Sequence, residues 1–215
     1  MSVIAVISSG DKVEISSVSV EGADIIYVKG LNTRRRLKRF ISRNKVNRAV
    51  IRGEVPAFTV AELEKRGIEL YTGKELMQVI YPLMISRAAK ISGNCENCTV
   101  YDTDLDGITL DIIKCAAAHF RYVSLETEED ASYIATEILS STGLALKLGA
   151  SGGVGIIRSG DGGNHDITVD MRGCGNTVFA DEKKRFFTAD VVEAILGEKI
   201  EKGVLERHKI KIHSL

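Results

Sequence analysis

The chain has 215 residues, 44% of them hydrophobic, and its 29 Lys and Arg side chains balance its 29 Asp and Glu side chains. This length fits one large domain or two smaller ones, and the balanced charge argues against binding nucleic acid through overall charge. The longest apolar run, at 76–85, is shorter than the roughly 18 to 20 residues of a membrane-spanning helix. With no secretory signal and only four cysteines, we expect a cytoplasmic protein without a membrane segment.

The first part of the chain changes from strands to alternating helices and strands. Three strands are predicted within the first thirty residues, where apolar residues either run together or alternate with polar ones. Asn32 and Thr33 are suited to cap a helix that reaches about Asn44, and a strand over 48–53 is expected to follow it.

The next two helices carry capping-box spacing at their expected starts. Thr59 and Glu62 have that spacing before a short helix, and the segment 72–75 has it before a long helix over 74–91. Short connections between these helices and strands favour parallel βαβ units. We therefore predict an N-terminal α/β lobe with leading β-strands at residues 1–92.

A polar break near residue 93 marks the expected start of a second lobe at residues 93–215. The strands there are expected at 98–102, 121–126 and 144–149, and the helices at 107–119 and 129–141. This alternation is half of a doubly wound nucleotide-binding fold. The predicted fold class is thus α/β and two-lobed, with a Rossmann-like C-terminal lobe that has a mainly parallel sheet plus a β-hairpin. The cleft between the lobes is the default ligand site in this prediction.

A glycine cluster follows at 148–163. Its "GASGGVG" segment resembles the glycine loop of zinc-independent quinone oxidoreductases, in which a long helix follows the loop. Three further glycines within 156–164 prevent a helix of useful length here. We therefore predict two strands, at 154–158 and 166–171, joined by a hairpin turn at Asp161-Gly162. Gly149 and Ser151 are retained as candidate ligand-binding residues, in case the cluster contacts a ligand instead.

Three carboxylates follow the first strand of the second lobe, at Asp102, Asp104 and Asp106. The Rossmann-like fold binds ligands at this end of its strands, and Glu126 holds the position that contacts the ribose. Three close carboxylates would repel a pyrophosphate and raise one another's pKa, so we expect no dinucleotide bound in the usual manner. We predict no metal site, with Asp102 and Asp104 as the candidate ligands if Mg²⁺ does bind. The alternative is that the aspartates cap the next helix.

A second partial resemblance gives the carboxylates a catalytic interpretation. "DTD" at 102–104 and "GDGGNHD" at 160–166 resemble motifs of haloacid-dehalogenase-type phosphatases. The resemblance implies that Asp102 is the nucleophile, that Asp104 is the general acid and that Thr127 is the phosphate-binding hydroxyl. It also implies metal contacts from two aspartates of the second motif. A magnesium-dependent phosphoryl-transfer enzyme is therefore one alternative function.

The cysteines show half of a zinc-ribbon spacing, at Cys95 and Cys98, without a second C-x-x-C. Cys115 lies four residues before His119 on one helix face, and Cys174 lies far along the chain. A zinc site would need these distant segments to converge. We interpret the cysteines as small core residues instead.

A basic segment gives the second alternative function. Between Arg34 and Arg52 there are nine basic residues and no acidic one. The apolar residues of the predicted helix share one face, which leaves a basic stripe over Arg34–Arg48 on the other. Such a stripe suits nucleic acid or another anionic partner, but no aromatic residues are interleaved with the charges. We therefore expect a solvated face that does not bind nucleic acid specifically.

No catalytic motif stands out along the chain, and whether it is an enzyme stays open. We predict a Rossmann-like protein that binds a small-molecule ligand or a protein partner in the inter-lobe cleft, with an unknown cofactor requirement. A homo-oligomer is compatible with this prediction. The ligand-binding candidates are Asp102, Asp104, Asp106, Glu126, Thr127, Gly149 and Ser151.

Overall fold

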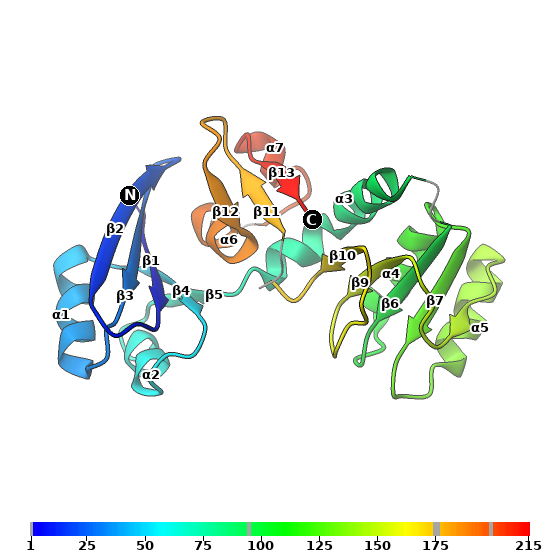
Figure 1. The fold of residues 1–215 in the computed structure, drawn as a ribbon, viewed down its shortest axis with the longest axis horizontal. Coiled ribbons are helices and arrows are strands. Elements are labelled where there is room, and N and C mark those ends of the chain that lie inside the picture. Colours follow the sequence, from blue (N-terminus) through cyan, green and yellow to red (C-terminus); the bar gives the residue numbers. More distant parts are fainter. Residues whose placement is uncertain (1, 94–95, 174–176, 198–199) are drawn as a thin grey trace. The chain divides into compact units, whose positions relative to one another are not determined.

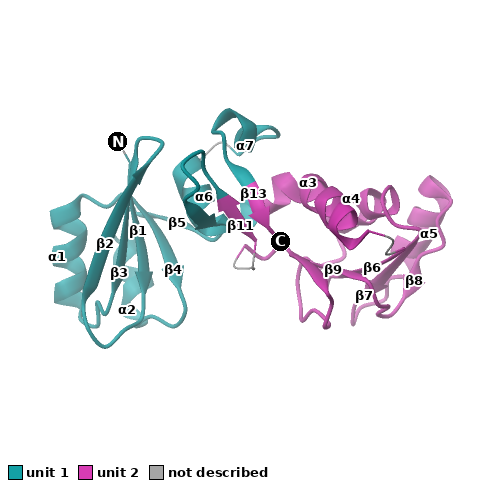
Figure 2. Ribbon diagram, turned by 45° about the horizontal axis from the view of Figure 1, so that its top comes forward, with its two compact units in different colours: residues 1–76, 180–211 teal, residues 77–179, 212–215 magenta. Residues whose placement is uncertain are grey.

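The computed structural model describes residues 2–93, 96–173, 177–197 and 200–215, and Figure 1 shows their fold. The chain forms two compact units, coloured in Figure 2: unit 1 holds residues 1–76 and 180–211, and unit 2 holds residues 77–179 and 212–215. Both contain helices and parallel strands, so the α/β fold class is confirmed. In the described ranges, no helix combines the length and apolar character that crossing a bilayer requires. The division into lobes at 1–92 and 93–215, expected from the sequence, stays a prediction.

Unit 1 is built on a five-stranded sheet, here called sheet A, with the strand order β2-β3-β1-β4-β5. Its strands are β1 Ser2–Ser8, β2 Glu14–Val20, β3 Ala23–Lys29, β4 Arg48–Arg52 and β5 Glu69–Tyr71. β1 pairs in parallel with β3 and β4, and β4 pairs in parallel with β5. β2 returns antiparallel along β3 and forms one edge of the sheet.

Helices cover both faces of sheet A. They are α1 Arg34–Asn44, α2 Phe58–Glu64 and α6 Ala189–Leu196. Leu37 and Phe40 of α1 are buried in a core that also contains Ala49 of β4. Because side chains alternate along a strand, the neighbouring Arg48 points to the opposite face, where its Nη1 donates to the Ala194 carbonyl of α6 at 2.9 Å. α1 and α2 therefore share one face, and α6 lies on the other.

Two of the predicted helix starts in unit 1 have different outcomes. α1 begins as expected at Thr33, whose Oγ1 accepts from the Arg36 amide at 3.3 Å. The capping box predicted for α2 is wrong. The helix begins at Phe58, its N-cap makes no side-chain hydrogen bond, and Thr59 is buried inside the first turn. Glu62 instead accepts from Arg66 Nε at 2.8 Å on the same helix side.

Unit 2 contains a second five-stranded sheet, sheet B, with the order β10-β9-β6-β7-β8. Its strands are β6 Asn97–Tyr101, β7 Tyr122–Glu126, β8 Lys147–Leu148, β9 Val154–Ile157 and β10 Ile167–Asp170. All the pairings are parallel, and α4 Gly107–Ala117 and α5 Ser132–Thr142 connect the first three strands. β7 and β8 lie on one side of β6, and β9 and β10 lie on the other, so the topological switch point is between β6 and β9.

The remaining elements are α3 Lys74–Ser92, α7 Val204–Arg207 and a three-stranded sheet. The strands of that sheet follow the order β12-β11-β13, with β11 at Val178–Ala180, β12 at Phe186–Thr188 and β13 at Lys211–Ser214.

The hairpin predicted from the glycine cluster is wrong. β9 and β10 are the expected strands, but they run parallel, with Ile156 opposite Val169. The connecting loop therefore has to return along the sheet, and its glycines allow it to lie close to the strands. A Cβ at Gly163 would lie 2.4 Å from the Tyr101 hydroxyl, and one at Gly155 would lie 2.6 Å from the His165 ring. The expectation that no long helix follows the cluster is confirmed, because β9 begins at Val154.

Candidate functional site

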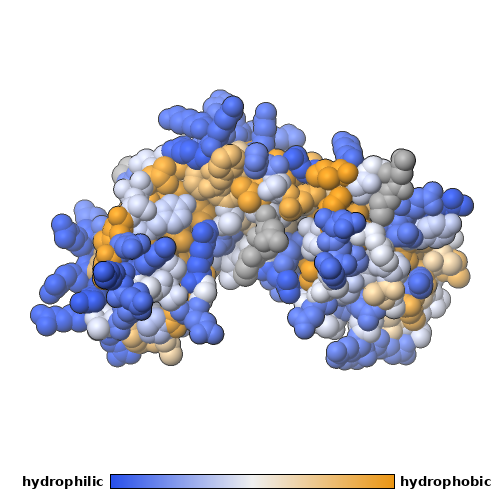
Figure 3. Space-filling model, in the orientation of Figure 1, coloured by the Kyte–Doolittle hydropathy of each residue, from blue (hydrophilic) through white to orange (hydrophobic). Residues whose placement is uncertain are grey.

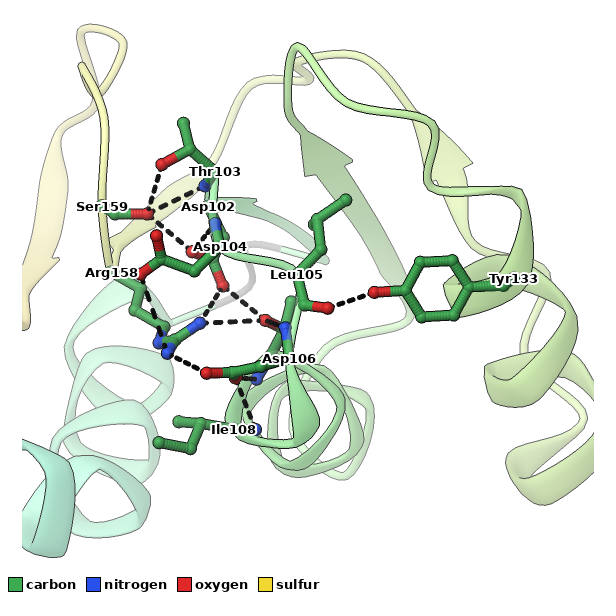
Figure 4. Close-up of polar contacts among 10 residues, drawn as sticks. Asp102, Thr103, Asp104, Leu105, Asp106, Ile108, Tyr133, Arg158 and Ser159 are labelled. Carbon is green, nitrogen blue, oxygen red and sulfur yellow. Dashed lines mark hydrogen bonds and ion pairs between the residues drawn. The ribbon is translucent and has the colours of Figure 1, made fainter.

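The switch point of sheet B contains the first candidate site, and Figure 4 shows its polar contacts. Asp102 follows β6, and only 1% of its surface is exposed. One carboxylate oxygen accepts from Ser159 Oγ at 2.6 Å and from the Asp104 amide at 3.1 Å. The other accepts from Thr109 Oγ1 at 2.5 Å and from Arg158 Nη1 at 2.7 Å. Both oxygens of Asp102 are therefore fully engaged by the protein itself.

Arg158 is the residue of this site that the sequence analysis missed. It follows β9 directly, is 6% exposed, and fills the space between the carboxyl ends of β6 and β9. Its Nη2 lies 2.6 Å from Asp106 Oδ2 and 3.8 Å from Asp104 Oδ2. One guanidinium thus binds the carboxylate cluster where this fold class places a ligand. Its presence after a buried strand was visible in the sequence, but only the parallel pairing of β9 with β6 brings it to the cluster.

Arg158 reverses the expected electrostatics of the aspartates. Burial raises the pKa of Asp102, but the hydrogen bonds from Ser159, Thr109 and Arg158 together lower it by more, so the pKa lies below the usual value. The pKa of Asp106 is also lowered, because its hydrogen bonds, foremost that from Arg158, outweigh the effect of burial. The expectation that the carboxylates raise one another's pKa is therefore wrong. The hydrogen bonds that the carboxylates accept, those from Arg158 among them, decide the sign.

Asp106 caps α4, as the alternative interpretation of these aspartates expected. Its Oδ1 accepts from the amides of Ile108 at 2.8 Å and Thr109 at 3.3 Å, and its own amide donates to Thr109 Oγ1 at 3.0 Å. This reciprocal pattern is a capping box. It places a protein carboxylate at the helix N-terminus, where a ligand phosphate binds in nucleotide-binding relatives of this fold class.

The other predicted site residues bind backbone or hydroxyl groups of their own turns or of neighbouring strands. Thr127 Oγ1 accepts from the Glu129 amide at 3.2 Å, and the Gly149 amide donates to a strand carbonyl at 2.9 Å. Ser151 Oγ lies 2.7 Å from Ser124 Oγ and therefore holds the glycine cluster against β7. The backbone carbonyl of Glu126 accepts from the Asp102 amide at 3.2 Å, and its side chain is half-buried. The structure gathers the three aspartates around one cation, whereas these four residues contact backbone or hydroxyl groups and not Arg158.

Within the described residues, no group of three His, Cys, Asp or Glu side chains is placed to hold a metal ion. Cys98 is buried in β6 and Cys115 is half-buried in α4. Cys95 and Cys174 lie outside the described residues, so the composite zinc site cannot be traced through them.

A second candidate site lies on sheet A of unit 1 and was not predicted. It is a cavity of about 380 Å³, here called the sheet A cavity, at the carboxyl ends of β1, β3 and β4. Open parallel α/β sheets bind ligands at this end of their strands. The residues that line it are Val6, Ser8, Glu14, Ile15, Ser16, Tyr27, Val28, Lys29 and Arg52. The register places Tyr27 beside Val6 and Ser16, which are opposite it on the neighbouring strands.

Arg52 is the fixed charged group of the sheet A cavity. Its Nε lies 3.3 Å from Asp190 Oδ2 and its Nη2 lies 3.2 Å from Asp190 Oδ1, so the pair is bidentate. Nη2 also donates to Thr188 Oγ1, which donates in turn to Asp190. Burial raises the pKa of the Tyr27 phenol more than the Arg52 charge lowers it, so this hydroxyl stays protonated at neutral pH. Asp190 is 138 residues from Arg52, and no local pattern links the two.

Comparison with known proteins adds little to this geometry. No protein-family model matches the chain, and no curated protein matches it. Among solved structures, L-tryptophan dehydrogenase from Nostoc punctiforme is similar, with a TM-score of 0.35 and 7% sequence identity. The similarity covers 73% of this chain and 56% of that one, so the chain spans little more than half the length of that dehydrogenase. A similarity of this extent carries no functional argument, and the proposals below depend on the sites themselves.

Proposed function

We propose that the protein binds a small ligand carrying a carboxylate or phosphate group in the sheet A cavity. The observation that carries this proposal is the bidentate Arg52–Asp190 pair, which holds a guanidinium at the cavity wall. Arg is suited to such anions because its guanidinium stays charged at physiological pH, and its pairing with Asp190 holds it in place. In the part of the chain that the structure describes, Nη1 of Arg52 has no hydrogen-bond partner and stays available to a ligand.

The other cavity groups fit the same ligand class. Three hydroxyls, from Ser8, Ser16 and Tyr27, supply donors and acceptors around Arg52. Lys29 adds a second positive charge, opposite the Glu14 carboxylate on β2. The apolar side chain of Val6 forms part of the floor. The volume of about 380 Å³ is within the range of small-molecule sites, roughly 300 to 1,000 Å³. These features support a binding function for unit 1, and the ligand site expected between the lobes stays a prediction.

The phosphoryl-transfer alternative has less support from the geometry. A nucleophilic carboxylate needs an oxygen that faces its substrate. Both oxygens of Asp102 accept hydrogen bonds from the protein, and Arg158 occupies the neighbouring space. A phosphate would also have to displace the Asp106 cap from the helix N-terminus. The carboxylate cluster supports a structural role in unit 2 better than a catalytic one.

The test is a thermal-shift and calorimetry screen of the full chain with small carboxylates, phosphate esters and inorganic phosphate. A ligand at 100 times its Kd should stabilise the native state by about 2.7 kcal/mol. We expect Tyr27→Phe to weaken binding by roughly 0.5 to 1.5 kcal/mol, since it removes one hydrogen bond and keeps the Arg52–Asp190 pair. Arg52→Gln should abolish the shift, and Arg35→Gln on the exposed side of α1 is the matched control.

Two results would contradict the proposal. One is a screen in which no anion stabilises the wild-type chain. The other is a ligand that stabilises Arg52→Gln as strongly as the wild type, because its site would then lie elsewhere. Tyr27→Phe separates loss of binding from a folding defect of Arg52→Gln, since this variant leaves Asp190 paired.

A further inference from the structure

The opposite face of sheet A carries a second hollow, here called the α1–β2 groove, of about 470 Å³. Figures 1 and 2 both show α1 and β2 running side by side at the end of unit 1. Its lining residues are Val13, Ile15, Leu31, Phe40, Arg36, Arg39, Arg43 and Asn44. Val13, just before β2, is 45% exposed and Ile15 in β2 is 59% exposed, so two aliphatic side chains lie open beside each other in one groove. The groove therefore joins an apolar floor to a basic wall.

The basic wall carries positive charge that the described chain does not neutralise. Arg36, Arg39 and Arg43 are exposed, and none of them has an ion-pair partner among the described residues. Arg34 and Lys38 of the same helix, by contrast, both lie within 4 Å of the buried Glu62 carboxylate. Figure 3 shows strongly hydrophilic side chains projecting at the left edge of the molecule, where α1 lies in the same orientation. The wall is complementary to an acidic partner.

The floor of the groove ends at an open strand edge. β2 is the outermost strand of sheet A, and residues 14–17 are all exposed. Near the other end of β2, Arg185 donates to the Ser19 carbonyl, so that end is already occupied. An edge strand without proline or a covering element offers backbone donors and acceptors to an added strand.

We propose that the α1–β2 groove binds an extended acidic segment of a partner protein, which adds to β2 as a further strand. Arginines three and four residues apart lie about 4.5 and 6 Å apart along a helix axis. Alternate side chains of a strand lie about 6.6 Å apart, so acidic residues at alternate positions would reach successive arginines. Side chains at these alternate positions all face the groove, so the methylene groups of the acidic residues would pack against Ile15 and Phe40. This site is on the other face of the sheet and does not depend on the proposed small-ligand cavity.

Two other occupants fit the groove less well. Single-stranded nucleic acid needs exposed aromatic side chains on which its bases stack, and the one aromatic residue of the groove, Phe40, is only 6% exposed. A second copy of the chain, paired β2 to β2 in an antiparallel sheet, would bring two rows of unneutralised arginines onto the same face. Such like-charge proximity is unfavourable. An acidic polypeptide satisfies the edge, the apolar floor and the basic wall together.

The test uses fluorescence anisotropy of a labelled nine-residue peptide of alternating glutamate and valine, added to the full chain. A peptide with glutamine in place of glutamate is the probe control. Arg39→Glu should weaken binding of the acidic peptide about tenfold, whereas Arg35→Glu, on the same helix but outside the groove, should leave it within about twofold. Ile15→Asp should weaken it similarly to Arg39→Glu, because it places a negative charge between the floor and the peptide.

Four outcomes would overturn the proposal. Equal binding of the acidic and glutamine peptides would show that the arginines do not recognise the partner. Absence of any binding of the acidic peptide to the wild type would show that the groove is not such a site. Tighter, Arg39-dependent binding of an oligonucleotide would assign the groove to nucleic acid. A dimer in sedimentation that Ile15→Asp dissociates would assign it to a second copy. Unchanged melting of each variant checks that the groove, and not the fold, has been altered.

Discussion

At the scale of single residues, Asp102 and Arg158 show how one buried cation changes the behaviour of an acidic cluster. The sequence "DTDLDG" displays only negative charges, and like charges in a partly buried place disfavour ionisation. In the structure, Arg158 binds two of the three carboxylates directly, and the remaining lone pairs of Asp102 are satisfied by hydroxyl and amide donors. The cluster is thus a compensated ion network that joins β6, β9 and α4.

Removing the carboxylate of Asp102 should destabilise the protein. Asp102→Asn removes the fully buried carboxylate that pairs with Arg158 at 2.7 Å, and removal of one member of a buried pair costs about 3 to 5 kcal/mol. Urea unfolding followed by circular dichroism measures the change in free energy of unfolding. Asp161→Asn, in the exposed loop after β9, is the matched control and should change it by less than about 0.5 kcal/mol. An Asp102→Asn variant more stable than the wild type would show that repulsion between carboxylates dominates after all.

The same network predicts a pH dependence of stability. The pKa values of Asp102 and Asp106 are lowered in the folded state. At a pH between the folded and the unfolded pKa, the unfolded chain therefore binds more protons than the folded one. Their contribution to stability should be complete above the unfolded pKa of about 3.9 and should be lost as the pH drops through the lower folded values. Unfolding in urea between pH 2 and pH 6 measures this.

Arg158→Met isolates the contribution of the network from that of other acidic groups. Without the guanidinium, the pKa of both carboxylates in the folded state should rise. The difference in free energy of unfolding between wild type and variant should therefore shrink as the pH falls below about 4, near the pKa of Asp in the unfolded chain. A difference that stays constant over this range would mean that Arg158 contributes through packing and not through charge.

At the scale of secondary-structure elements, the sequence predicted features that depend on neighbouring residues. The cap at Thr33 is such a local signal, and it is present. The capping box at Thr59 failed because tertiary burial of that side chain outweighs its capping preference. The direction of β10 also escaped prediction, since the Asp161-Gly162 turn signal gives no information about which way the next strand runs.

Contacts between distant elements account for what the sequence could not show of the two candidate sites. The aspartates could be named from their spacing, but Arg158 joins them only through the parallel register of β6 and β9. In the same way, Arg52 and Tyr27 stand out neither by motif nor by spacing. They share a face because strands alternate, and Asp190 reaches Arg52 from α6. Ile15 of β2 lines both hollows of sheet A, so one edge strand contributes to both proposals.

At the scale of the whole molecule, unit 1 is assembled from two separated stretches of chain. Seven of the eight residues of α6 are buried, and this helix packs on β1, β4 and β5. Because side chains alternate along a strand, Ile4, Val6 and Val50 lie on the face that α6 covers, and each is at most 3% exposed. Burying one such side chain is worth roughly 1.5 to 3 kcal/mol. The second stretch therefore supplies a large share of the core of unit 1.

This arrangement predicts that a fragment of residues 1–92, ending at the boundary expected from the sequence, does not fold cooperatively by itself. Without α6 it would expose the apolar face of sheet A and lose the Asp190 partner of Arg52. Thermal melting and the dispersion of amide NMR signals would show this, and addition of a fragment of residues 177–215 should restore a cooperative transition. A fragment of residues 93–176 is the matched control and should restore nothing, because it lacks α6. Cooperative melting of 1–92 alone would instead support that boundary as a true domain limit, with α6 a dispensable cover.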